Sequence, residues 1–236
     1  GLDTHFALPS IDTIESLIHS KTRAIFICNP NNPSGYVYTK SELEALAQLA
    51  LKHDIFFIVD EVYREFVYDG QAHTSVLQFE GLEQHAILID SMSKRYSMCG
   101  ARIGCLITRN KEIIHAALKF AQSRLCPPTI ALHACEAALD EPQQYLDDAV
   151  AEYQLRRETA VSCLNAIEGV RVAMPKSAFY CLVRLPVADS DHFAKWMLES
   201  FEDKGETLMV APANGFFSGN TTGKDMIRIA FVLNAE

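Results

Sequence analysis

The strongest constraint on the fold comes from short apolar segments that alternate with amphipathic helical patterns. Residues 24–28, 55–59 and 86–90 are apolar almost throughout, which is typical of strands buried on both faces of a parallel sheet. Between the first two segments, Thr39 is a suitable N-cap for a helix that extends to about Lys52. Strands that alternate with helices indicate an α/β fold, in which a mostly parallel sheet is flanked by helices.

The carboxyl-terminal part of the chain has a different pattern. A fourth strand is expected at residues 103–108, antiparallel because its connection to the third is short. Helices are then expected at 111–122, 128–139 and 142–167, followed by strands at 170–172, 178–183 and 226–231 and a helix at 191–201. Strands that return after a long helix suggest a second, smaller α+β domain. We therefore expect a partial large domain at residues 1–150 and a small domain at 151–236, with a hinge inside the long helix.

Composition excludes several classes of protein. The 236 residues are 49% hydrophobic, which allows a substantial core, and the net charge of −9 without any basic run argues against a nucleic-acid binder. The apolar segments are too short to cross a bilayer, and no signal peptide is recognisable. The seven cysteines form no C-x-x-C pair, so neither a metal cluster nor a disulfide framework is indicated. We expect buried thiols in a reducing, cytoplasmic compartment.

Residues 87–104 contain the most suggestive chemistry. Lys94 directly follows the third apolar segment, where desolvation and the nearby Arg102 would favour a neutral amine able to condense with an aldehyde. Ser91, Ser93 and Arg102 supply hydroxyl donors and a cationic fork, a combination suited to a phosphate. Taken by itself, this stretch is interpreted equally well as an ordinary surface turn.

Two other segments end in polar residues that would complete such a site. Asp60, after the second apolar segment, could keep a ring nitrogen protonated, and Tyr63 and Asn32 could bind a phenolic oxygen. Singly, Asp60 or Glu61 is better explained as a helix cap and Asn32 as a turn residue. Since the carboxyl ends of parallel strands meet at one edge of a sheet, the combination predicts a site for a pyridine aldehyde phosphate.

These motifs resemble those of the class I and II aminotransferases, which belong to the aspartate aminotransferase superfamily of fold type I pyridoxal-phosphate enzymes. The resemblance covers essentially the whole chain. It rests on Asn29–Gly35 (Asn-Pro-Asn-Asn-Pro-Ser-Gly), Asp60–Tyr63 (Asp-Glu-Val-Tyr), Ser91–Lys94 with Gly100–Gly104, and Arg228–Phe231.

The resemblance implies pyridoxal 5′-phosphate as cofactor and gives each motif residue a role. Lys94 would be the Schiff-base lysine and the general acid and base, which first removes the substrate α-proton. Asp60 would pair with the ring nitrogen. The remaining cofactor contacts would come from Asn32 and Tyr63 at the ring oxygen and from Ser91 and Arg102 at the phosphate, with Ser93 as a weaker candidate. Arg228, together with Asn32, would bind the substrate carboxylate. The resemblance also implies a cis Asn32–Pro33 bond and a homodimer.

The chain departs from the family at its amino-terminal side. Family members carry a long preceding region that supplies further phosphate contacts, an aromatic residue that stacks on the cofactor ring, and several strands of the large domain. We therefore expect a carboxyl-terminal fragment with an incomplete large-domain sheet, open sheet edges and uncovered apolar faces. Such a chain should bind the cofactor weakly and transaminate poorly. The expected reaction transfers an amino group from an aspartate-like amino acid to a 2-oxo acid. The alternatives are a pyridoxal-phosphate-dependent lyase or decarboxylase, or a non-catalytic assembly partner.

Overall fold

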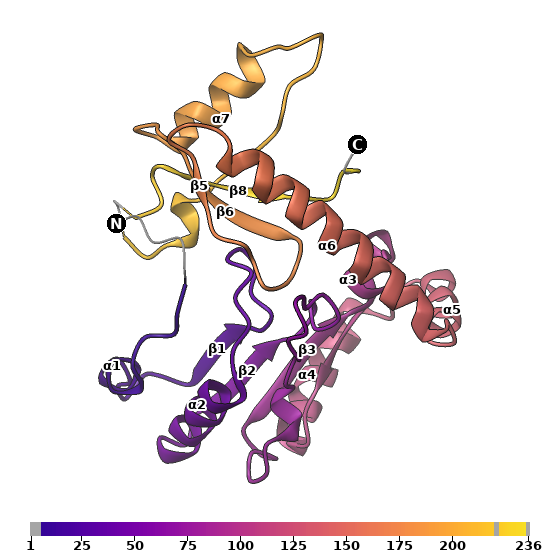
Figure 1. The fold of residues 1–236 in the computed structure, drawn as a ribbon. Helices are drawn as coiled ribbons and strands as arrows, with labels where there is room; N and C mark the ends of the chain where they lie inside the picture. The colour runs from indigo at the N-terminus through magenta and orange to yellow at the C-terminus, as the bar shows by residue number, and fades with distance from the viewer. Residues whose placement is uncertain (1–5, 220–221, 235–236) are drawn as a thin grey trace. The chain divides into compact units, whose positions relative to one another are not determined.

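The computed structural model describes residues 6–219 and 222–234 and divides the chain into two compact units (Figure 1). The amino-terminal unit contains residues 7–31 and 37–150. The carboxyl-terminal unit contains the described residues among 1–6, 32–36 and 151–236. The chain passes from one unit to the other inside helix α6 (Gln143–Asn165).

The amino-terminal unit is built on a mixed sheet with the strand order β1-β2-β3-β4. Strands β1 (Ala24–Cys28), β2 (Phe56–Asp60) and β3 (Ala86–Ser91) are parallel, and β4 (Gly104–Ile107) is antiparallel to β3, as predicted. The register pairs Cys28 with Asp60 and Asp60 with Ile89. The carboxyl ends of the parallel strands are therefore level, and the segments that follow them start from one edge of the sheet.

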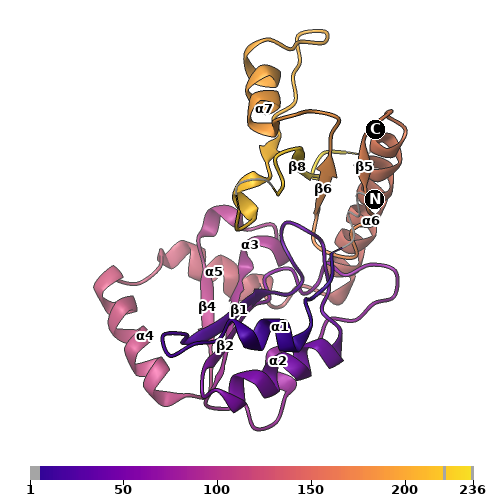
Figure 2. The same cartoon turned by 90° about the vertical axis from the view of Figure 1, so that its left-hand side faces the viewer.

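Helices pack on this sheet to different extents. Helix α2 (Lys40–Lys52) begins with a capping box formed by Thr39 and Glu42, and its buried face packs with β2 and β3 in one apolar core. Figure 2 shows α4 on one side of the strands and α1 and α2 on the other. The other helices of this unit are α1 (Ile11–Ser16), α3 (Met92–Arg95), α4 (Lys111–Arg124) and α5 (Thr129–Ala138), with 3-10 turns at Val76–Gln78 and Cys99–Ala101.

Two expectations about burial in this unit are wrong. Strand β1 is not buried on both faces: Ile25 and Ile27 pack against the core below α2, whereas Phe26 points to the opposite face and remains 64% exposed. The cysteines are not uniformly buried either. Cys105 is exposed because it lies on the other edge strand, β4, and Cys99 and Cys126 are exposed in turns. Only Cys135 and Cys181 are buried among the described residues.

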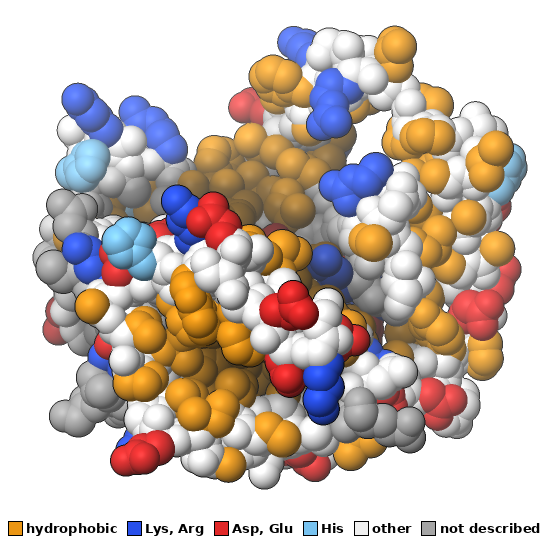
Figure 3. Space-filling view, turned by 90° about the horizontal axis from the view of Figure 1, so that it is seen from above, with side chains coloured by type: hydrophobic (Ala, Val, Ile, Leu, Met, Phe, Trp, Pro, Cys, Tyr) orange, Lys and Arg blue, Asp and Glu red, His pale blue; other side chains and the backbone are white. Residues whose placement is uncertain are grey.

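Exposed apolar side chains are frequent on the helices that follow β4. Helix α4 has no buried residue, and Phe120, Leu125 and Ile130 are 75%, 80% and 86% exposed. Hydrophobic side chains also lie open on the face drawn in Figure 3. The expectation of uncovered apolar surface is therefore confirmed for this part of the chain.

The carboxyl-terminal unit contains an antiparallel sheet with the order β5-β6-β8-β7. Its predicted strands and helix are present as β5 (Arg171–Val172), β6 (Tyr180–Arg184), α7 (Ser190–Glu199) and β8 (Met226–Ala230). The short strand β7 (Ala211–Pro212) and the 3-10 turn Asn214–Phe216 were not predicted. In the parts of the chain that the structure describes, no helix combines the length and the apolar character needed to cross a membrane.

Candidate active site

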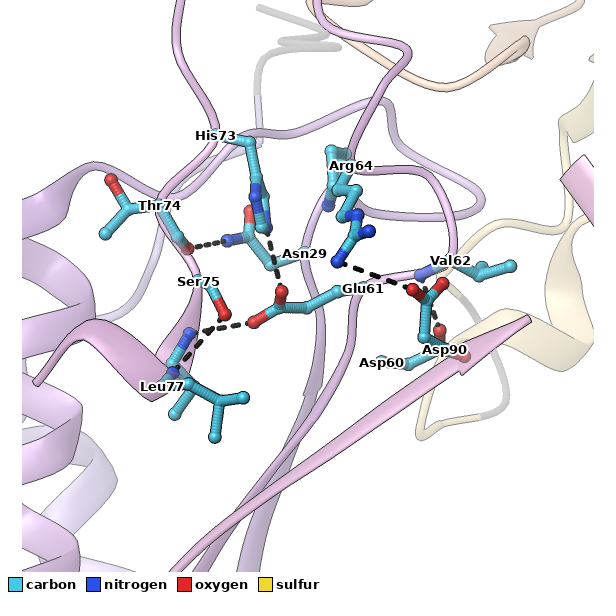
Figure 4. Close-up of polar contacts among 12 residues, drawn as sticks. Asn29, Asp60, Glu61, Val62, Arg64, His73, Thr74, Ser75, Leu77 and Asp90 are labelled. Atoms are coloured by element: carbon cyan, nitrogen blue, oxygen red, sulfur yellow. Dashed lines mark hydrogen bonds and ion pairs between the residues drawn. The ribbon is translucent and has the colours of Figure 1, made fainter. Parts of the chain in front are cut away.

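Asp60 ends strand β2 at the carboxyl edge of the sheet. Its Oδ1 accepts a hydrogen bond from the Val62 backbone N–H at 3.0 Å (Figure 4). Partial burial raises the pKa of the Asp60 carboxyl, and the negative charge of Asp90 raises it further. An ionised Asp60 would therefore gain from a cationic partner, as the predicted role at a protonated ring nitrogen requires.

Lys94 lies in α3, a single helical turn that sequence reasoning did not predict. The turn begins directly after β3, and the Ser91 hydroxyl caps it by accepting from the Ser93 N–H at 3.1 Å. The same hydroxyl lies 2.9 Å from the carbonyl oxygen of Ile103 and 2.8 Å from Ser93 Oγ. Ser91 thus already fixes the backbone around Lys94, whose side chain is half-buried.

Arg102 and Tyr63 complete the predicted set in the amino-terminal unit. Arg102 is exposed and has a left-handed backbone with φ of +56°, and its Nη1 donates to the Cys99 carbonyl at 2.9 Å. Because a guanidinium has five donors, this bond leaves others for an anion. Tyr63 follows β2 and is only 3% exposed. All these residues lie on segments that follow β2 or β3, or at the strand ends themselves.

Asn32 and Arg228 belong to the carboxyl-terminal unit and contact each other there. Arg228, on strand β8, donates from Nη1 to Asn32 Oδ1 at 3.2 Å. Its guanidinium carbon lies 4.7 Å from the ring centre of Tyr180 and 5.2 Å from that of Phe216. These cation–π contacts orient a planar fork that suits bidentate recognition of a carboxylate. The implied cis Asn32–Pro33 bond is confirmed, and Asn29–Pro30 is also cis.

Gly35 ends the turn that carries Asn32 and allows a close approach between backbones. Its φ is +69°, and its carbonyl accepts from the Lys176 N–H and the Ser177 hydroxyl, both at 3.0 Å. A methyl group at Gly35 would overlap Pro175 Cβ and lie 3.1 Å from Pro175 Cα.

We expect Gly35→Ala to lower the free energy of unfolding by about 3 kcal/mol, because it combines a strained φ with overlap against a proline. Gly205→Ala is the matched control, since Gly205 has a φ of +84° but no atom within 4 Å of the added Cβ. That change should cost about 1 kcal/mol. Urea denaturation measures both, and equal losses would show that the contact with Pro175 contributes nothing.

A buried polar cluster next to Asp60 was missed. Glu61 is 0% exposed, its Oε1 accepts from the Val76 N–H at 2.8 Å, and its Oε2 lies 3.6 Å from His73 Nε2 (Figure 4). Burial raises the pKa of Glu61 to about 7 and lowers the pKa of His73 to about 4. The sequence offered one signal, an acid beside Asp60 at a strand end, but it did not identify the histidine as its partner.

The residues of the amino-terminal unit fit the predicted cofactor in their chemistry. Lys94 supplies an amine, Ser91 and Ser93 supply hydroxyls, and Arg102 supplies a guanidinium with donors to spare. Asp60 is a partly buried carboxyl whose raised pKa shows that its ionised form lacks sufficient stabilisation. A pyridinium nitrogen would provide that stabilisation.

Comparison with known proteins decides the family. Residues 9–214 match the model of the family described as aminotransferase class I and II. The chain belongs to this family. It is 33% identical over 225 residues to an aspartate aminotransferase of Bacillus subtilis (strain 168), covering 92% of this chain and 56% of the relative. It is 32% identical over 232 residues to aromatic-amino-acid aminotransferase 2 of Thermococcus litoralis, covering 96% and 57%.

Solved aminotransferases share the fold of this family member. The aromatic aminotransferase of Pyrococcus horikoshii OT3 superposes with a TM-score of 0.84 at 30% identity, covering 97% of this chain and 60% of that structure. An aspartate aminotransferase from Thermus thermophilus with maleate gives a TM-score of 0.84 at 28% identity, covering 97% and 57%. The predicted fold class, part of an α/β pyridoxal-phosphate transferase fold, is therefore confirmed. The chain spans somewhat more than half the length of these relatives.

Proposed function

We propose that this chain carries cofactor-binding and substrate-binding residues of a pyridoxal-phosphate-dependent aminotransferase. The observation that carries the proposal is the set of groups at the carboxyl edge of the sheet, where Asp60 ends β2 and Lys94 follows β3, in a chain of this family. The reaction would move an amino group from an amino acid to a 2-oxo acid. Relatives named for aspartate and for aromatic amino acids support these two substrate classes, of which we favour the aspartate-like one.

Lys94 and Asp60 would perform the central steps. When bound, pyridoxal phosphate supplies a pyridinium ring that stabilises the negative charge left as a proton departs from the substrate. Lys94 Nζ would hold the cofactor covalently and, once released, would act as the general base that takes the proton from the substrate Cα and then as the general acid that gives it back. Asp60, ionised, would hold the proton on the ring nitrogen.

The other predicted residues would bind and orient. Tyr63 and Asn32 are proposed for the ring oxygen, and Ser91 with Arg102, assisted by Ser93, for the phosphate. Ser91 would act partly through the cap that fixes the turn of Lys94.

Arg228 would bind the α-carboxylate. Its contacts with Asn32, Tyr180 and Phe216 support this role, because they orient the guanidinium and leave donors for two carboxylate oxygens.

We further propose that this chain binds the cofactor weakly when it is alone. The predicted phosphate contacts after β3 are the hydroxyls of Ser91 and Ser93 and the exposed guanidinium of Arg102, and the Ser91 hydroxyl is already engaged in capping α3. By the family resemblance the working assembly would be a homodimer in the cytoplasm, and sedimentation of the purified chain would test the dimer.

A half-reaction distinguishes an aminotransferase from a lyase or decarboxylase. The chain is loaded with excess pyridoxal phosphate and mixed with aspartate or phenylalanine, without any 2-oxo acid. We expect slow formation of pyridoxamine phosphate with one equivalent of the corresponding 2-oxo acid, faster with aspartate. Release of carbon dioxide, or of pyruvate with ammonia, would contradict the proposal, and so would the absence of pyridoxamine phosphate at saturating cofactor.

A further inference from the structure

Four charged side chains next to Lys94 form a closed ring of alternating sign. Arg95 Nη2 donates to Asp90 Oδ2 at 2.9 Å, and Arg95 Nε pairs with Glu65 Oε1 at 3.0 Å. Arg64 closes the ring, with Nε 3.2 Å from the same Glu65 oxygen and Nη1 3.4 Å from the same Asp90 oxygen. We call Arg64, Glu65, Asp90 and Arg95 the charge ring.

The charge ring connects the segments that follow two neighbouring strands. Asp90 lies within β3 near its carboxyl end, and Arg95 is the last residue of α3, directly after Lys94. Arg64 and Glu65 lie in the segment that follows β2 and Asp60. The ring therefore fastens the carboxyl-terminal end of the helical turn of Lys94 to its own strand and to the segment after β2.

Both partners of the Arg95–Asp90 ion pair are buried. Arg95 and Asp90 are only 8% and 7% exposed, so removing one partner would leave the other as a buried charge without its main counter-ion. Asp90 Oδ1 also accepts from the Ser91 N–H at 2.7 Å, at the residue that caps α3. Loss of the Arg95 guanidinium would leave Asp90 with the Ser91 N–H and the longer contact to Arg64. We expect the turn of Lys94, which would no longer be held at Arg95, to become more mobile.

One member of the charge ring, Asp90, also has an electrostatic effect on Asp60. The charge of Asp90 is one of the causes that raise the pKa of Asp60.

We propose that Arg95 is a positioning residue for Lys94, because its guanidinium, held between Asp90 and Glu65, fixes the turn that carries the reactive amine. The role rests on the proposed function of Lys94. Arg95 acts through the backbone of α3 and through Asp90, without touching the reacting atoms.

Hydrogen exchange and chemical trapping test the role together. The variants are Arg95→Met, which removes the charge, Arg95→Lys, which keeps it but loses the fork, and Glu65→Gln, which removes one partner. Arg109→Met is the matched control, because Arg109 is 70% exposed and its contact with Glu83 is 3.9 Å long. Exchange is followed by mass spectrometry in peptides that cover residues 91–97. Trapping uses pyridoxal phosphate and borohydride, with the pyridoxyl label quantified at each lysine.

In Arg95→Met we expect exchange in residues 91–97 to quicken by about tenfold or more, and trapping at Lys94 to slow by about tenfold, with other lysines unchanged. Arg95→Lys should recover part of both losses, and Glu65→Gln should show a smaller change in the same direction. If Arg95→Met proves unfolded, the results for Arg95→Lys and Glu65→Gln decide whether Arg95 positions the turn of Lys94.

Exchange and trapping in these variants that match Arg109→Met would overturn the proposal. Failure of the wild-type chain to trap cofactor at Lys94 is a different result. It would contradict the proposed function, while the exchange data would still decide whether Arg95 fixes the turn.

Discussion

Lys94→Ala is expected to abolish covalent capture of pyridoxal phosphate at the strand edge of this chain. By the proposed function, the wild-type Lys94 amine would add to the aldehyde carbon with loss of one water, and borohydride would then deliver hydride to the new carbon–nitrogen double bond. The product is a stable pyridoxyl-lysine, which survives digestion and is found by mass. Alanine has no nucleophile, so the label at residue 94 is lost completely. The remaining label should be spread over exposed lysines at their ordinary slow rate.

Two further variants make the Lys94 experiment specific. Lys94→Arg keeps a cation and a long side chain but cannot form the bond, and it should lose the label as alanine does. Lys119→Ala, on an exposed face of α4, should leave labelling at Lys94 unchanged. If Lys94→Ala still took up the wild-type amount of label at one other lysine, the reactive amine would have been assigned to the wrong residue.

Local sequence was sufficient to place the strands and the predicted residues along them. Continuous apolar segments correspond to β1, β2 and β3, and Asp60 ends β2 while Lys94 follows β3, at the edge that parallel strands share. The Thr39 cap and the buried face of α2 were also predictable, since both depend on residues a few positions apart.

Burial and long-range pairing were not predictable, because they depend on what lies beside an element. The apolar segment of β1 is typical of a strand buried on both faces, yet Phe26 is exposed on the face opposite to the core that Ile25 and Ile27 contact. Arg95 has the composition of an ordinary helix-end cation, and only the fold brings Glu65 to it. Likewise His73 lies twelve residues from Glu61, and no periodic pattern links them.

The second large effect concerns this pair of Glu61 and His73, whose contributions to the pH dependence of stability should cancel. In the folded chain Glu61 has a pKa of about 7 against an ordinary 4.5, and His73 has a pKa of about 4 against an ordinary 6.5. Between pH 4.5 and 6.5 the folded pair carries one proton, on Glu61, and the unfolded pair also carries one, on His73. Equal proton numbers in both states mean that the pair adds no slope in this window.

Single substitutions should reveal the two opposite pH dependences of the free energy of unfolding that Glu61 and His73 contribute. In Glu61→Gln only the histidine titrates, and the unfolded chain binds more protons than the folded one. Stability relative to wild type should therefore rise with pH, by about 3 kcal/mol between pH 4.5 and 6.5. In His73→Leu only the carboxyl titrates, and the folded chain binds more protons. Its relative stability should fall by about 3 kcal/mol between pH 4.5 and 6.5.

The double variant is the control, because it removes both Glu61 and His73 and leaves every other titrating group of the chain in place. Asp60, whose pKa is also raised, and the nearby charges of Arg64, Glu65 and Asp90 remain in all four proteins, so their contributions drop out of the comparison. Glu61→Gln combined with His73→Leu should run parallel to wild type between pH 4.5 and 6.5, at a constant offset. Urea denaturation at pH 4.5, 5.5 and 6.5 measures the four curves. Single variants that also run parallel to wild type would show that Glu61 and His73 keep ordinary pKa values, and the buried contact between them would then have to carry full charges.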